Sequence, residues 1–128
     1  MPKTPEGVIK LNVARILAKS QAVFGVNVFF WYNASTGVWD RRTGAFRRNT
    51  SPYAILGVAD ILGVLEDGTF LAIEVKSAKG RLSEHQKKFL KRITDMRGIA
   101  LVVYSSSDFV LKFNQALLAK SLKANYRT

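Results

Sequence analysis

The chain has 128 residues, of which 48% are hydrophobic, and this balance is typical of one globular domain, residues 1–128, rather than of a disordered segment. No apolar run is long enough to cross a bilayer, and the first residues lack the basic-then-apolar pattern of a signal peptide. Cysteine is absent, which excludes disulfides and thiolate metal sites and favours a cytoplasmic location.

The charge balance indicates the kind of partner. Twenty Lys and Arg residues face nine Asp and Glu residues, which gives a net charge of +11 and a pI near 10.3. A small domain this basic is expected to bind a polyanion, most often nucleic acid. Binding to an anionic membrane would call for a basic amphipathic helix with aromatic anchors, and the sequence offers no clear one, so we expect no membrane partner.

The first predicted element is a helix. Thr4 suits its N-cap and Pro5 its first position, and apolar residues at helical spacing continue it to a point before Gly25. Glu6 lies one turn before Ile9, on the buried side of the apolar stripe. Position alone leaves two interpretations of Glu6 open: an acid that interacts favourably with the helix dipole, or an acid that points into a site.

The next segment combines a strand with a basic, punctuated stretch. Residues 26–32 are β-branched and aromatic and predict a strand, and residues 38–39 and 45–46 predict short strand pieces. Two arginine pairs interleave with aromatic residues here: Arg41, Arg42, Arg47 and Arg48. We predict that these arginines bind phosphate, whereas each aromatic ring is more often a core residue.

Residues 58–65 and 69–76 predict a β-hairpin around Glu66-Asp67-Gly68. Both strands are otherwise apolar on both faces, so helices should cover the sheet on both sides. The exceptions are Asp60, Glu74 and Lys76. Burying two carboxylates and a lysine is costly, and such a cost usually marks a site.

The hairpin turn decides whether these residues meet. A two-residue turn would put Asp60 and Glu74 on opposite faces of the sheet. A three-residue loop, with Gly68 in the left-handed conformation, would put Asp60 directly opposite Glu74. Lys76, two residues further on, would share that face. We predict the three-residue register.

A helix is predicted from its cap at Ser83 to about Arg97, with Gly98 as its left-handed stop. Gln86 either closes a capping box with Ser83 or points towards the hairpin. Residues 99–104 predict a short central strand, and a last helix follows. The resulting order, αβββαβ with a final helix, predicts an α/β fold with a mixed sheet between helices.

Two carboxylates on adjacent strands suit a hard divalent cation, Mg²⁺ or Mn²⁺, and the carbonyl of Val75 could add a ligand. Such an ion can polarise a phosphoryl oxygen, and a lysine beside it can orient the attacking water or stabilise the pentacovalent phosphorane. The pattern therefore indicates metal-dependent phosphodiester hydrolysis. The alternative is a structural ion pair between Glu74 and Lys76.

Asp60 followed by Glu74-Val75-Lys76 resembles the signature of the PD-(D/E)XK nuclease superfamily. The string GVADILGVLEDGTFLAIEVKSAKGRLSEHQKKFL, residues 57–90, resembles the VRR-NUC family within it, especially small stand-alone phage-type members. The likeness extends to about Val103 and, more loosely, to the first helix; Ala59 replaces the proline of the superfamily name. It implies a restriction-endonuclease-like core, in which Gln86 is the glutamine of the site helix and Glu6 the acid of the first helix.

The resemblance implies a Mg²⁺- or Mn²⁺-dependent endonuclease for branched, Holliday-junction-like DNA, acting as a homodimer in a bacterial or phage-infected cell. The predicted catalytic residues are Asp60, Glu74, Lys76 and Gln86, and the predicted metal ligands are Glu6, Asp60, Glu74 and the carbonyl of Val75. The predicted DNA-binding residues are Arg41, Arg42, Arg47, Arg48, Lys79 and Arg81. Two alternative hypotheses are a non-catalytic basic DNA-binding module and a nuclease for RNA or single strands. The presence of all three of Asp60, Glu74 and Lys76 argues against the non-catalytic module.

Overall fold

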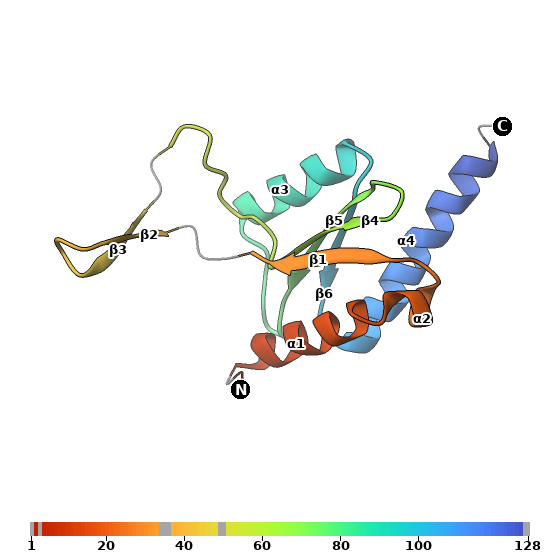
Figure 1. The fold of residues 1–128 in the computed structure, drawn as a ribbon, viewed down its shortest axis with the longest axis horizontal. Helices are drawn as coiled ribbons and strands as arrows, with labels where there is room; N and C mark the ends of the chain where they lie inside the picture. Colours follow the sequence, from red (N-terminus) through yellow and green to blue (C-terminus); the bar gives the residue numbers. More distant parts are fainter. Residues whose placement is uncertain (1, 3, 34–36, 49–50, 127–128) are drawn as a thin grey trace.

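The computed structural model describes residues 2, 4–33, 37–48 and 51–126, apart from the side chains of residues 37–39, 46–48 and 123–126. Its main sheet has the strand order β1-β4-β5-β6, formed by β1 (Val28–Tyr32), β4 (Ile61–Leu65), β5 (Phe70–Val75) and β6 (Ile99–Val103). The β5–β6 pair is parallel and the other two pairs are antiparallel, so the sheet is mixed as predicted. A separate hairpin of β2 (Gly37–Asp40) and β3 (Ala45–Arg48), at the predicted strand pieces, projects away from this sheet (Figure 1).

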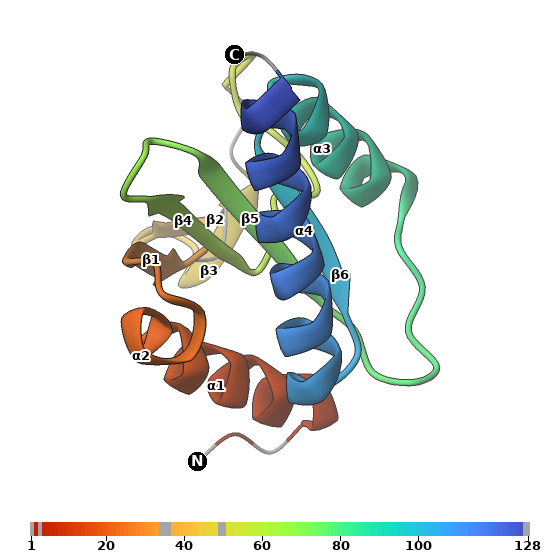
Figure 2. The ribbon, with the colours of Figure 1, turned by 90° about the vertical axis from the view of Figure 1, so that its right-hand side faces the viewer.

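Helices cover both faces of the main sheet, and Figure 2 shows α1 and α3 on opposite sides of it. On one face, α1 (Pro5–Leu17) and α4 (Ser106–Tyr126) bury Val13, Phe109 and Phe113 against Ile61 and Ile73. On the other face, α3 (Glu84–Asp95) packs onto Ala72 and Ala100. Strand side chains alternate between faces, so β5 sends its odd-numbered residues to the first layer and its even-numbered residues towards α3. The predicted α/β architecture is confirmed, and the αβββαβ order holds for the main sheet and its helices once α2 and the β2–β3 hairpin are set aside. No helix of the described residues is long and apolar enough to cross a membrane.

The hairpin between β4 and β5 has the predicted register. Ile61 pairs with Ile73, the N–H of Leu65 donates to the carbonyl of Thr69 at 2.8 Å, and Gly68 has a φ of +90°. Continued by one residue, this register puts Asp60 opposite Glu74. The strands are shorter than predicted, since β4 begins only after Asp60.

The N-terminal helical region ends at the predicted glycine but is interrupted. α1 stops at Leu17, and the short helix α2 (Ser20–Phe24) follows, with Gly25 at its C-cap and a φ of +76°. The break lets Phe24 contact Phe109 and Phe113 edge-on, with ring centroids 5.8 and 4.7 Å away. These contacts span most of the sequence, so apolar periodicity within residues 5–24 does not reveal the change of direction.

The predicted stop of α3 was wrong in one respect. Arg97, not Gly98, adopts the left-handed conformation, with a φ of 68°. Gly98 is needed for space instead, because a Cβ there would lie 2.6 Å from Cγ2 of Ile93 and 3.0 Å from the carbonyl oxygen of Phe70.

This arrangement predicts opposite effects for neighbouring substitutions. Arg97→Gly is expected to stabilise the protein by about 1 kcal/mol, because a residue with a Cβ pays a steric cost in the left-handed region. Gly98→Ala is expected to destabilise it by about 1–3 kcal/mol through overpacking against β5. Urea unfolding of both variants beside the wild type checks the pair. A stabilising Gly98→Ala variant would show that the close approach is not present in solution.

Candidate active site

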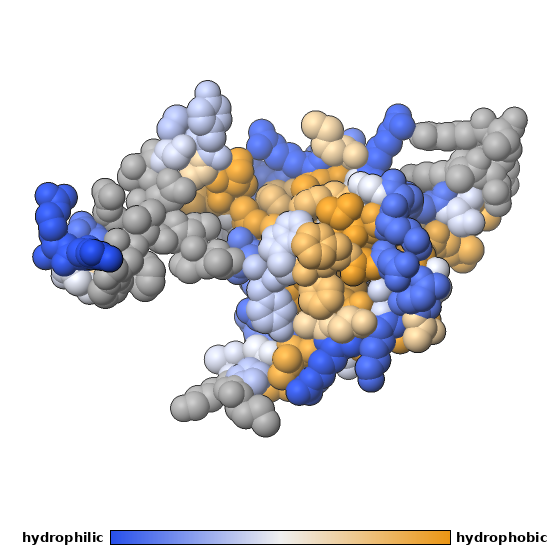
Figure 3. Space-filling view, viewed as in Figure 1, coloured by the Kyte–Doolittle hydropathy of each residue, from blue (hydrophilic) through white to orange (hydrophobic). Residues whose placement is uncertain are grey.

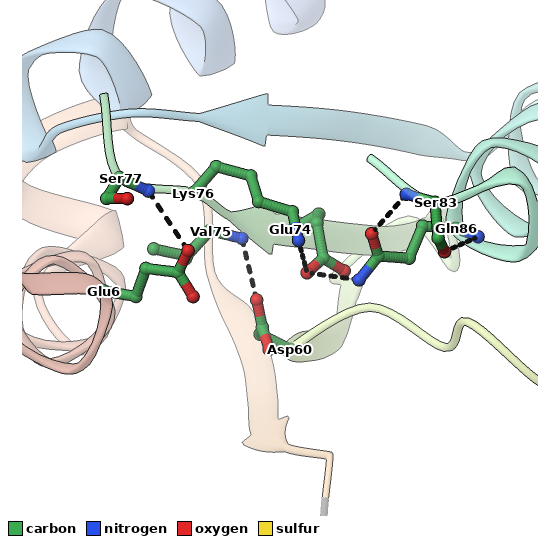
Figure 4. A network of polar contacts seen from close by, with 8 residues as sticks. All are labelled: Glu6, Asp60, Glu74, Val75, Lys76, Ser77, Ser83 and Gln86. Atoms are coloured by element: carbon green, nitrogen blue, oxygen red, sulfur yellow. Dashed lines mark hydrogen bonds and ion pairs between the residues drawn. The ribbon is translucent and has the colours of Figure 1, made fainter. Parts of the chain in front are cut away.

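Four of the predicted site residues form one cluster at the end of β5 (Figure 4): Asp60, Glu74, Lys76 and Gln86. Glu74 is only 3% exposed and lies on the α3 side of the sheet. Asp60, on the neighbouring chain segment, accepts a hydrogen bond from the N–H of Val75 to Oδ2 at 2.8 Å. The Nζ atom of Lys76 lies 3.8 Å from Oε1 of Glu74, with 13% of the lysine side chain exposed. The three-residue hairpin turn thus brings together the residues that the sequence placed on one face.

The two carboxylate oxygens of Glu74 have different surroundings. Oε1 accepts a hydrogen bond from Nε2 of Gln86 at 3.2 Å. Oε2 is the one buried side-chain nitrogen or oxygen without a hydrogen-bond partner among the described residues. Burial, with a further contribution from the adjacent Asp60 carboxyl, raises the pKa of Glu74 to about 8, although Lys76 acts in the opposite direction. Without a cation, the cluster therefore disfavours the charged form of Glu74.

Gln86 fulfils both of the roles that the sequence left open. Its Oε1 accepts from the N–H of Ser83 at 2.9 Å, and its own N–H donates to Oγ of Ser83 at 3.2 Å, which completes a capping box. Because the cap uses the amide oxygen, the amide NH₂ is turned towards Glu74. The start of α3 therefore fixes the orientation of a site carboxylate.

Glu6 points back at the same cluster from α1 (Figure 4). The side chain of Thr4 caps α1, accepting from the N–H of Gly7 at 2.9 Å, and so sets Glu6 in the first turn. Oε1 of Glu6 accepts a hydrogen bond from the N–H of Ser77 at 3.3 Å, and its negative charge also helps to raise the pKa of Glu74. The inward-pointing interpretation of Glu6 is supported, and its role as a metal ligand stays a prediction.

The donor set fits a hard divalent cation. The carboxyl groups of Asp60 and Glu74 interact directly, and the buried Oε2 of Glu74 has no hydrogen-bond partner in the part of the chain that the structure describes. Within the described residues, no three His, Asp or Glu side chains converge closely enough to hold an ion alone. Mg²⁺ is commonly held by one or two carboxylates together with water and substrate phosphate, which two acids can provide. The N–H of Val75 donates a hydrogen bond to Asp60. The role of the Val75 carbonyl as a metal ligand stays a prediction.

The predicted DNA-binding residues lie outside this cluster. Arg41 and Arg42 are exposed at the tip of the projecting hairpin, which Figure 3 shows as strongly hydrophilic. Arg42 lies 3.9 Å from Asp40 and is 90% exposed. The side chains of Arg47 and Arg48 lie outside the described residues. Lys79 and Arg81 are exposed in the loop between β5 and α3, which leads directly from Lys76 to the cap of Gln86.

Two features beside the site were missed by sequence reasoning. Gly57 has a φ of +77°, and a Cβ there would lie 2.5 Å from the backbone nitrogen of Gln86 and 2.6 Å from the carbonyl oxygen of His85. The available signal was a glycine three residues before a site carboxylate. The second feature is a cation–π contact, in which Nζ of Lys10 lies 4.7 Å from the ring centroid of Tyr32. Tyr32 ends the strand that lies beside Asp60, and no sequence pattern indicates this contact.

The raised pKa of Glu74 predicts a pH dependence of stability in EDTA. In the folded protein Glu74 binds its proton more tightly than in the unfolded chain, where the pKa is near 4.5. The contribution of Glu74 is therefore most favourable below pH 4.5 and is lost as the pH rises through 8. Stability should fall over this window by on the order of 5 kcal/mol relative to a Glu74→Gln variant.

Urea unfolding of both proteins at several pH values, with EDTA and then with Mg²⁺, measures this difference. Mg²⁺ should restore more stability at pH 8 than at pH 5, because only the ionised carboxylate binds it. Parallel pH profiles for wild type and Glu74→Gln would contradict the raised pKa.

Comparison with known proteins identifies the family. Residues 47–107 match the family model of the VRR-NUC domain, and this segment contains Asp60, Glu74, Lys76 and Gln86 but not Glu6. No curated protein and no solved structure gives a significant match to the chain. A VRR-NUC domain implies a nuclease-type function in DNA processing, and the four-stranded mixed sheet between helices is compatible with a restriction-endonuclease-like core. The family to which the hairpin motif pointed is thereby confirmed: through residues 47–107, the chain carries a VRR-NUC domain.

Proposed function

We propose that this protein, acting as a single domain, is a Mg²⁺- or Mn²⁺-dependent endonuclease that hydrolyses phosphodiester bonds in branched, Holliday-junction-like DNA. The observation that carries the proposal is the buried, unpartnered Oε2 of Glu74 opposite Asp60, with Lys76 beside it. A buried carboxylate oxygen without a hydrogen-bond partner is costly unless a ligand completes it. The VRR-NUC domain and the net charge of +11 support DNA as the substrate.

Each residue of the cluster has its own role in the proposed reaction. A divalent cation bound by Asp60 and Glu74 would neutralise charge on the scissile phosphate. The N–H of Val75 holds Asp60, and Gln86 holds Glu74 so that Oε2 stays free for that role. Lys76 can donate a hydrogen bond to the attacking water or to a non-bridging phosphate oxygen, where negative charge develops.

The approach surface and the assembly extend the proposal. Lys79 and Arg81 bind phosphates next to the site, and the hairpin arginines bind them further away. Two cuts across a symmetric junction need two sites, which favours a homodimer. An apolar surface for a second copy is available on the edge strand β1, where Phe29 is 72% and Trp31 39% exposed. In Figure 3 the middle of this face is apolar and is bordered by hydrophilic residues.

To test the proposal, cleavage of a four-way junction, a flap and a plain duplex by the protein is measured with Mg²⁺, with Mn²⁺ and with EDTA. Lys76→Ala is expected to lower cleavage by about 10²–10⁴-fold, since it removes a group that acts on developing charge. Lys87→Ala, an exposed lysine paired with Glu84 outside the cluster, is the matched control and should keep full activity.

Cleavage that survives EDTA or the Lys76→Ala change would contradict the mechanism. Tight binding without a metal-dependent product would favour the non-catalytic DNA-binding module. Light scattering of the protein alone and with junction DNA tests the assembly, and a monomer in both samples would contradict the homodimer.

A further inference from the structure

A groove separate from the carboxylate cluster runs between α3 and the segment before β4. Its volume is about 420 Å³. One wall is formed by residues 54–56, and the other by side chains of α3 that include His85, Lys88, Phe89 and Arg92. A groove of this volume is comparable in size to about one or two nucleotides.

The groove places free positive charge beside exposed apolar surface. Its only acidic wall residue, Asp95, pairs with Lys91 at 2.8 Å. Among the described side chains, Lys88 and Arg92 have no carboxylate partner. On the facing wall, Ile55 and Leu56 are 44% and 40% exposed. Sites for single-stranded nucleic acid combine cations that hold phosphates with aromatic side chains on which bases stack. In this groove Phe89 is the aromatic wall residue, and Ile55 and Leu56 add apolar contact surface.

Both walls of the groove continue into the catalytic cluster. On one wall, Leu56 is followed by Gly57, which lies against the backbone of His85 and Gln86, and Asp60 comes three residues later. On the other wall, His85 precedes Gln86, whose amide donates to Glu74. A strand that leaves the cluster across the first turn of α3 therefore enters the groove.

We propose that this groove binds unpaired nucleotides of the substrate next to the scissile phosphate. Lys88 and Arg92 hold the phosphates, and Ile55 and Leu56 contact the bases. The inference rests on the proposed function for the identity of the ligand, and it adds that branched DNA with a single-stranded arm, such as a flap, binds more tightly than a blunt duplex or a fully paired junction. Because Lys88 and Arg92 are assigned to phosphates and the base contacts are apolar, the expected preference is for unpaired structure rather than for sequence.

The experiment measures binding in EDTA, where the proposed cleavage cannot occur. Fluorescence anisotropy compares a labelled blunt duplex with the same duplex carrying an unpaired arm. Lys88→Ala/Arg92→Ala is expected to weaken binding of the armed DNA at least 10-fold more than binding of the blunt duplex. The slope of log K against log salt should become shallower by about 1.4, at about 0.7 for each phosphate contact on a single strand.

Lys19→Ala/Lys87→Ala removes the same charge from exposed positions outside the groove and is the matched control, for which the slope should not change. Ile55→Ser/Leu56→Ser should weaken binding of the armed DNA with an unchanged salt slope, because this contact is not ionic. Equal losses on armed and blunt DNA, or no loss on either, would overturn the proposal.

Cleavage of the same preparations with Mg²⁺ is a separate readout. Cleavage without selectivity for the unpaired arm would support the proposed nuclease function and reject the groove as a nucleotide-binding site. Arm-selective binding without cleavage would support the groove as a nucleotide-binding site and reject the nuclease function.

Discussion

Glu74→Gln is expected to abolish cleavage and, in EDTA at alkaline pH, to stabilise the protein. The rate of metal-dependent cleavage should fall at least about 1000-fold, because the substitution removes the charged oxygen that faces Asp60. At pH 8.5 the free energy of unfolding should rise by on the order of 5 kcal/mol, because a buried charge that is ionised there is replaced by a neutral side chain of the same shape. The two effects have opposite signs because the site sacrifices stability for metal binding.

This pair of outcomes separates the catalytic interpretation from a structural ion pair. If Glu74 served only to pair with Lys76, Glu74→Gln would leave a lysine that is 13% exposed without its partner, and the protein would lose stability. Single-turnover cleavage and urea unfolding in EDTA measure both quantities on one preparation. Glu84→Gln, at a side chain that is 80% exposed, is the control and should change stability by less than about 0.5 kcal/mol. Lower stability of Glu74→Gln at pH 8.5 would contradict the account.

Gly57→Ala is expected to damage both stability and catalysis. The φ of +77° strains any residue with a Cβ, and that Cβ would meet the backbone of His85 and Gln86 rather than a movable side chain. Destabilisation of about 2–4 kcal/mol should result from strain plus overpacking. Cleavage should fall by about 100-fold in the protein that stays folded, because the loop to Asp60 and the turn that carries Gln86 are pushed apart.

A glycine at a matched position isolates the steric part. Gly25 has nearly the same φ, +76°, and a Cβ there would meet nothing within 4 Å. Gly25→Ala should therefore cost only about 1 kcal/mol and leave the cleavage rate of the folded protein unchanged. Urea unfolding gives the stability of both variants, and single-turnover assays well below the unfolding midpoint give the rates. Equal costs for the two substitutions would show that Gly57 does not dock the loop onto α3.

The parts of the site that follow from local chemistry were predictable from the sequence. Gly68 sets the turn, the turn sets the register, and the register puts Asp60 opposite Glu74. The two-residue period then places Lys76 on the same face. Gln86 was predictable in the same way, because the capping box that orients its amide is a local pattern that begins at Ser83.

The parts that depend on distant contacts were not predictable. The break between α1 and α2 serves contacts of Phe24 with Phe109 and Phe113, more than eighty residues away in the chain. The conformations of Arg97 and Gly98 are decided by the approach of Gly98 to Phe70 on another element. Periodicity and turn propensity describe one element at a time, whereas these features belong to pairs of elements.

Anomalous diffraction tests most directly whether Asp60 and Glu74 together hold the divalent cation. Crystals grown with MnCl₂, with data collected at the manganese absorption edge, should show an anomalous peak about 2.0–2.3 Å from Oε2 of Glu74 and from a carboxylate oxygen of Asp60. Crystals of Glu74→Gln should lack this peak. An active protein whose manganese lies elsewhere, or whose peak persists in Glu74→Gln, would contradict the account.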